Sequence, residues 1–201
     1  EVGQIHPEVQ SHVAYNPDSE IIPTTRANGV TTALIVPRGG VIAGRSSLLN
    51  LDGWTWEDAA VKLNLGLHVN WPRERIITAW WMEDSPEEQS KRNAENRKRL
   101  TEAFARAHAY MLARGAGVDK GLDARWEAML PVLRGEMPLF VHANDYGQIE
   151  QALHFAREYD LRMVLVGGND SWRLAELLAE YDIPVILGRT QSLPAHEDQA
   201  Y

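Results

Sequence analysis

The feature that most constrains the fold is a strand–turn–helix pattern that the second half of the chain uses twice. Short apolar runs begin at residues 138, 162 and 184, so their starts lie 24 and 22 residues apart. The first two runs end in Val141-His142-Ala143-Asn144-Asp145 and Val166-Gly167-Gly168-Asn169-Asp170, and each is followed by an amphipathic segment. This is the spacing of consecutive βα units, so residues 138–188 are predicted to form β-α-β-α-β.

The first half follows the same alternation with weaker signals. We predict helices over 19–28, just after Thr55, from a Ser85 cap to Arg114, and over 122–133, with strands at 30–36 and 65–70. Residues 37–53 are rich in glycine, and we predict a long loop there with a short strand around 47–51. Gly39, Gly40 and Gly44 lack the Gly-Lys-Ser/Thr ending of a phosphate loop, so we interpret them as a tight loop over a barrel mouth.

Alternating strands and helices without hairpin signals predict a parallel α/β architecture, either a barrel or an open sheet. We count five or six strands in one domain covering residues 1–201. A complete (β/α)8 TIM barrel needs about 250 residues. A barrel built from this chain would therefore be incomplete.

Composition narrows the function classes. The formal net charge of −8 argues against nucleic acid, whose binding relies on clustered basic residues. There is no cysteine, which excludes disulfides and thiolate chemistry, and no apolar run approaches the ~20 residues of a membrane span. The charge itself says little about a substrate. The start at Glu1-Val2-Gly3 suits a processed product or a fragment, so the compartment is not fixed, and a periplasmic or secreted protein that has lost its signal peptide remains compatible.

Two of the seven histidines, His68 and His142, fall at the carboxyl ends of predicted strands. Barrels and open parallel sheets both place their active sites at that edge. His142 is therefore a candidate metal ligand or catalytic base, although a buried imidazole bonded to a neighbouring carbonyl is the alternative. The helix cap of this turn is assigned to Asp145, so the turn itself does not require a histidine at 142.

Further polar residues surround the same predicted edge. Strand alternation places His68 and Asn70 on one face, where they either line a pocket or form a polar patch under a loop. Arg45 and Ser46 follow the glycine-rich loop and are positioned to touch a ligand. Asn144 suits a turn and is also a candidate lining residue.

Residues 16–58 (NPDSEIIPTTRANGVTTALIVPRGGVIAGRSSLLNLDGWTWED), 65–72 (LGLHVNWP) and 138–188 resemble the imidazolonepropionase-related branch of the metal-dependent amidohydrolases. The resemblance implies a (β/α)8 barrel that hydrolyses amide, lactam or related C–N bonds of a small-molecule substrate with metal-activated water. It also implies a divalent metal ion, zinc by preference, in the complete protein.

Only some of the family's metal-binding positions have a matching residue in this chain. His142 matches the metal ligand at the end of the fifth strand of the family's barrel. Asn70 stands where related deacetylases have a metal-binding glutamate, and Gly167 lies where the family has a second histidine. The His-x-His pair of the first strand and the aspartate of the last strand have no match. The expected coverage is therefore about the second to seventh strands of the barrel.

These observations predict a metal-dependent hydrolase of which this chain forms a portion without a complete metal site. An incomplete barrel would expose sheet edges, so association into homo-oligomers is expected. The alternative is a non-catalytic α/β module that binds a small ligand or a protein partner. Asn70 and Gly167, at positions where the family has metal ligands, favour this alternative.

Overall fold

The computed structural model describes residues 3–78, 80–118 and 121–188. Its strands form one six-stranded sheet in chain order: β1 (Thr32–Ile35), β2 (Ile42–Asn50), β3 (Ala60–Asn70), β4 (Leu139–Ala143), β5 (Met163–Gly167) and β6 (Val185–Leu187). The pairs from β3 to β6 are parallel, as predicted. The described residues form a curled half barrel, and a closed eight-stranded barrel is not shown.

The prediction of an all-parallel sheet is wrong for the first three strands, because β1, β2 and β3 pair antiparallel. The connection between β1 and β2 runs through Gly39 and Gly40, both at positive φ, and is therefore the turn that the sequence interpretation missed. The connection between β2 and β3 contains the four-residue helix α2 (Trp56–Ala59), so it lacks the two-residue signal of a tight hairpin.

The predicted loop over residues 37–53 is also wrong, since residues 42–50 form the nine-residue strand β2. Gly44 belongs to this strand and adopts φ +125°. The N-terminal segment crosses the strand at this point. A Cβ on Gly44 would lie 2.7 Å from the carbonyl oxygen of Val9. The glycines therefore allow the N-terminal segment to lie against β2, and they do not form a mouth loop.

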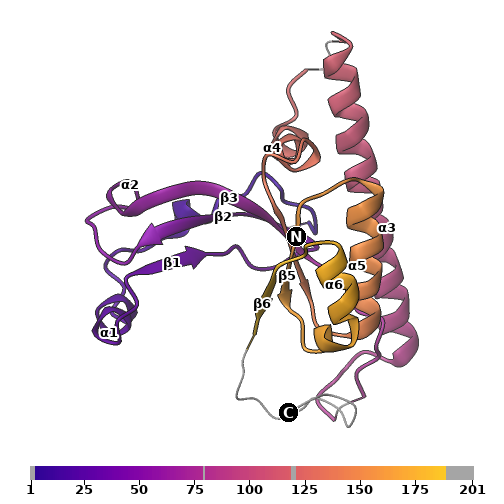
Figure 1. Ribbon diagram of the computed structural model, residues 1–201, viewed down its shortest axis with the longest axis horizontal. Helices are drawn as coiled ribbons and strands as arrows, with labels where there is room; N and C mark the ends of the chain where they lie inside the picture. The colour runs from indigo at the N-terminus through magenta and orange to yellow at the C-terminus, as the bar shows by residue number, and fades with distance from the viewer. Residues whose placement is uncertain (1–2, 79, 119–120, 189–201) are drawn as a thin grey trace.

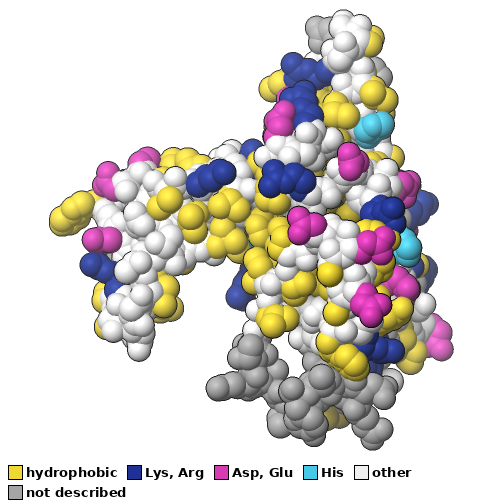
Figure 2. Space-filling model, in the orientation of Figure 1, with side chains coloured by type: hydrophobic (Ala, Val, Ile, Leu, Met, Phe, Trp, Pro, Cys, Tyr) yellow, Lys and Arg dark blue, Asp and Glu magenta, His cyan; other side chains and the backbone are white. Residues whose placement is uncertain are grey.

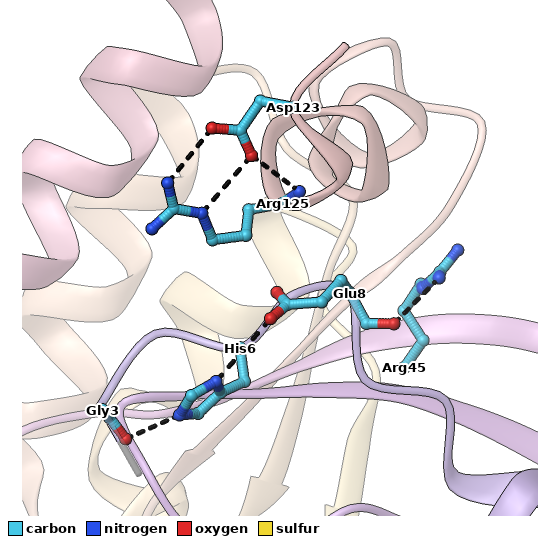
Figure 3. Close-up of polar contacts among 6 residues, drawn as sticks. All are labelled: Gly3, His6, Glu8, Arg45, Asp123 and Arg125. Atoms are coloured by element: carbon cyan, nitrogen blue, oxygen red, sulfur yellow. Dashed lines mark hydrogen bonds and ion pairs between the residues drawn. The ribbon is translucent and has the colours of Figure 1, made fainter. Parts of the chain in front are cut away.

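Figure 3 shows how this N-terminal segment is held. The Glu8 carbonyl oxygen accepts a hydrogen bond from Arg45 Nη2 at 3.3 Å, and Glu8 Oε1 lies 3.7 Å from His6 Nδ1. Gln10 forms an isolated parallel bridge with Arg45, and Ser11 donates to the Ile35 carbonyl at 2.7 Å. Backbone and side-chain hydrogen bonds therefore hold the N-terminal segment against β2.

The helices agree well with their sequence signals. They are α1 (Ile21–Ala27), α3 (Pro86–Gly115), α4 (Ala124–Leu133), α5 (Tyr146–Glu158) and α6 (Ala175–Glu180), with 3-10 turns η1 (Ser11–Ala14) and η2 (Ser171–Leu174). A complete capping box between Ser85 and Glu88 begins α3, as predicted. Thr55 accepts from the Asp58 amide and begins α2. None of the helices in the described ranges is long and apolar enough to span a membrane.

The core lies between the parallel strands and helices α3, α4 and α5. Leu67 and Val69 of β3 and Leu139 and Val141 of β4 point into it, together with Phe104 of α3. In Figure 1 helices α3, α5 and α6 cover one side of these strands, while β1, β2 and β3 project away as an arm. The opposite face of the parallel strands is therefore left free of helices and carries the polar residues described below.

Apolar side chains remain exposed on the arm and on the last strand. They include Val30, Trp54, Val61, Leu63, Ile186 and Leu187. Figure 2 shows hydrophobic side chains gathered where the arm joins the rest of the chain. The free edges of β1 and β6 lie at the two ends of the same sheet.

We expect Gly44→Ala to lower the free energy of unfolding by about 1–3 kcal/mol, because its Cβ would clash with the Val9 carbonyl in a backbone region that alanine disfavours. Urea denaturation followed by tryptophan fluorescence measures the change. Gly115→Ala, in a helix with nothing within 4 Å of the new Cβ, is the control and should be neutral or slightly stabilising. Equal stabilities of the two variants would contradict this account of the glycine.

Candidate functional site

The parallel pairing of β3 and β4 brings His68 and His142 together. In this register His68 lies beside Phe140 and Asn70 beside His142, at the carboxyl ends of both strands. Because Leu67 and Val69 point into the helical core, the intervening His68 and Asn70 face the opposite side, as predicted. Nδ1 of His68 lies 2.9 Å from Nε2 of His142, so the two imidazoles share a hydrogen bond.

Phe140 holds the His68 ring in place. The two rings are stacked, with centroids 4.7 Å apart and an interplanar angle of 3°. The Phe140 ring in turn lies over Gly66, where an added Cβ would come within 2.2 Å of a ring carbon. The missing side chain at position 66 therefore leaves the space for the phenyl ring, and the phenyl ring positions His68.

Burial favours the neutral form of both imidazoles. The His68 side chain is 1% exposed, and its burial, together with the nearby His142, lowers its pKa to about 3. Burial also lowers the pKa of His142. When both rings are neutral, one nitrogen of the pair donates and the other accepts. Nε2 of His68 is buried without a hydrogen-bond partner in the described part of the chain.

Asn70 is half-buried and does not contact His142 through a hydrogen bond in the described residues. Its Nδ2 donates to the carbonyl oxygen of Gly40 at 2.8 Å. The backbone amide of Asn70 donates to the Val41 carbonyl at 2.9 Å. Asn70 thus ties the end of β3 to the turn before β2, next to the His68–His142 pair.

The other two candidates from the first half of the chain, Arg45 and Ser46, lie on β2. Ser46 is fully buried beside Gly66, and its hydroxyl donates to the Gly66 carbonyl at 3.4 Å. Arg45 pairs with Leu67, which places its side chain on the opposite face from His68. Arg45 contacts the N-terminal segment there, and burial lowers the pKa of its guanidinium.

Asn144 occupies the space left by Gly167. A Cβ on Gly167 would lie 2.4 Å from Asn144 Oδ1, and Gly167 adopts φ +100°. A histidine at 167 would therefore be strained, and it would displace Asn144. The Asn144 carbonyl also accepts from the Asp170 amide at 2.9 Å, which joins the two turns whose sequences are similar.

Those two turns use their aspartates differently. Asp145 forms a capping box with Gln148 at the start of its own helix, α5. Asp170 Oδ2 instead accepts from the Tyr146 amide, the first of α5, at 3.0 Å. Asp170 therefore contacts the neighbouring βα unit.

Sequence reasoning predicted the capping box of Gln148 with Asp145 but missed Phe140 and the contact of Gln148 with Trp71. Phe140 alternates with His142 along β4, so the period-2 pattern could have placed it on the same face. Gln148 is buried; its Nε2 donates to the Trp71 carbonyl at 2.8 Å, and its Oε1 accepts from the amides of Asn144 and Asp145. The contact with Trp71 joins segments 77 positions apart, and no local pattern reveals it.

The described residues include no cluster of three or more histidine, aspartate or glutamate side chains suited to a metal ion. The His68–His142 pair supplies two imidazoles that are bonded to each other. In the described part of the chain Nδ1 of His142 makes no hydrogen bond, so this nitrogen can accept a proton or bind an electrophile.

Comparison with known proteins shows which fold the chain resembles. No protein-family model matches the chain, and no curated protein matches it in sequence. Among solved structures it is similar to an amidohydrolase from Thermotoga maritima MSB8, with a TM-score of 0.80 and 23% identity. The match covers 98% of this chain and 52% of that one, so the chain spans about half the length of the solved structure. The chain therefore has an amidohydrolase-like α/β fold.

The buried pair predicts a pH dependence of stability. The unfolded chain protonates His68 below about pH 6.5, whereas the folded chain keeps it neutral down to about pH 3. The contribution of the neutral His68 ring to stability is therefore fully present above about pH 6.5, and it is lost as the pH falls from there toward about pH 3. From this ring we expect the free energy of unfolding of the metal-free protein to decrease by about 2 kcal/mol between about pH 7.5 and pH 5, as measured by urea denaturation.

His68→Phe removes the titrating ring and should flatten this dependence by about the same amount. The matched control is His154→Gln on the exposed side of α5, which should leave the dependence unchanged. An identical slope in wild type and His68→Phe would refute the assignment of a neutral, buried His68.

Proposed function

We propose that this chain forms part of an amidohydrolase-type enzyme that hydrolyses amide or other C–N bonds, with His142 as one ligand of a divalent metal ion. Zinc is the expected ion, because imidazole is a preferred zinc ligand. The fold likeness supports the class of enzyme. The sequence resemblance of residues 16–58, 65–72 and 138–188 supports the imidazolonepropionase-related branch. When bound, the ion would lower the pKa of a water molecule to about 7 and polarise the substrate carbonyl.

The observation that carries the proposal is the orientation of the His142 ring. Its Nε2 is engaged with His68 at 2.9 Å, which leaves Nδ1 as the nitrogen able to bind metal. A metal-binding histidine commonly donates its other ring N–H to a second group that fixes its orientation. In this assignment His142 Nε2–H donates to His68 Nδ1, and the proton of His68 is on Nε2.

The fit to a metal ion is partial. His142 provides a nitrogen of the right kind at the carboxyl edge of the sheet, but a catalytic zinc takes about three protein ligands. The described residues do not supply that number. The proposal therefore requires further ligands from outside the described residues or from another polypeptide.

The second candidate is a non-catalytic module that binds a small ligand or a protein. It is favoured by Asn70, whose amide is bonded to the Gly40 carbonyl, and by Gly167, whose missing side chain leaves room for Asn144. The exposed apolar residues of the arm, with Trp54 at 90% exposure, favour association with a protein or with a second copy of the chain.

Zinc titration separates the two candidates. Nitrogen-15 NMR of the imidazoles reports the tautomer of each ring, and we expect zinc to perturb Nδ1 of His142 while Nε2 of that ring keeps its proton. His142→Ala should weaken zinc binding by at least tenfold, and His68→Phe by about tenfold, because it removes the partner that orients the ring.

His154→Ala is the control for adventitious binding by surface imidazoles and should leave the affinity unchanged. Zinc binding that is unaffected by His142→Ala, or a His142 ring protonated on Nδ1 alone, would contradict the proposal. The binding-module candidate would then stand.

A further inference from the structure

A cavity of about 390 Å³ lies beside the start of α5. All of its lining residues follow the carboxyl ends of β3, β4 and β5: Glu74, Arg75, Asp145, Tyr146, Gly147, Asp170 and Arg173. Parallel sheets bind ligands at this edge, and the volume falls in the range of small-molecule sites.

The three carboxylates that line the cavity are engaged with other groups. Glu74 contacts Gln151 and lies 3.7 Å from Arg97. Asp145 forms the capping box of α5, and Asp170 is buried with Oδ2 bonded to the Tyr146 amide. These side chains therefore hold the loops and the helix start in place around the cavity.

The two arginines that line the cavity, Arg75 and Arg173, differ from its carboxylates. Within the described ranges, neither Arg75 nor Arg173 forms an ion pair or a side-chain hydrogen bond. Arg173 lies over the Tyr146 ring, with 4.8 Å between its Cζ and the ring centroid. The Tyr146 hydroxyl donates to Glu150 Oε1 at 3.0 Å, which fixes the ring beneath the guanidinium. The stacking leaves the N–H edge of Arg173 available to a ligand.

We propose that this cavity, the Arg75–Arg173 pocket, binds the carboxylate of a small organic anion. A guanidinium presents two parallel N–H donors that match a carboxylate, and such charge-assisted pairs are strong. The three nearby carboxylates disfavour a dianion such as phosphate more than a singly charged group. A carboxylate is therefore the oxyanion that suits the pocket.

The pocket requires no metal ion, so its test is independent of the proposed hydrolysis. The probes are N-acetylglycine, its neutral analogue N-acetylglycinamide, and inorganic phosphate, each titrated into the metal-free chain at neutral pH. Backbone amide chemical shifts of Tyr146, Gly147 and Arg173 report binding. We expect saturable shifts with N-acetylglycine and at least tenfold weaker binding of both other probes.

Two variants test the arginines. Arg75→Gln and Arg173→Gln should each weaken N-acetylglycine binding by about tenfold or more, and higher salt should weaken binding to the wild type. Arg173→Lys keeps the charge without the paired donors and should fall between wild type and Arg173→Gln. Both positions are exposed, so the variants are expected to fold normally.

Arg157→Gln is the matched control, because Arg157 on α5 also lies over a tyrosine, with its Cζ 4.2 Å from the Tyr181 ring centroid. It should bind the probe as wild type does. The proposal is overturned if N-acetylglycine gives no saturable shift, if N-acetylglycinamide or phosphate binds as tightly, or if the glutamine variants match the control.

Discussion

The register between β3 and β4 is the constraint on which the rest of the structure depends. It joins the antiparallel arm to the parallel strands, and it sets which residues face the helices. With Leu67 beside Leu139, the aliphatic side chains of both strands enter the core. The same register then places His68 and His142 on the free face. A shift by one residue would turn the histidines toward the helices and expose the aliphatic residues, so burial of the core and formation of the pair are linked.

Local patterns predicted the second half of the fold well because each unit there is self-contained. The Asp145–Gln148 box lies within a few residues of sequence, and so does the Ser85 cap of α3. The antiparallel arm was missed because the connection between β2 and β3 contains α2 and lacks the two-residue signal of a tight hairpin. Gly40 and Gly44 are required because residues 4–10 lie close to β2. The sequence alone did not show which segment lies there, because the contact is long-range.

The positions of the candidate residues were predicted from the sequence only in part, and their chemical roles stay predictions. Alternation and strand ends correctly selected His68, Asn70 and His142 as neighbours at one edge. The hydrogen bond between the two imidazoles depends on which strands pair, so it could not be derived from either strand alone. The face on which Arg45 lies could not be derived either, since it follows from the pairing of Arg45 with Leu67. Charges at the Arg75–Arg173 pocket come from three separate turns that only the folded sheet assembles.

The contact between Gly66 and Phe140 has a consequence for homologous sequences. A side chain at position 66 and an aromatic ring at position 140 cannot occupy the same space. The two positions should therefore covary: homologues that carry a larger residue at 66 should have a small residue at 140. Such homologues would also lose the ring that stacks on His68, so the histidine at 68 should disappear with it. The residue at position 66 should therefore indicate which homologues keep the paired imidazoles.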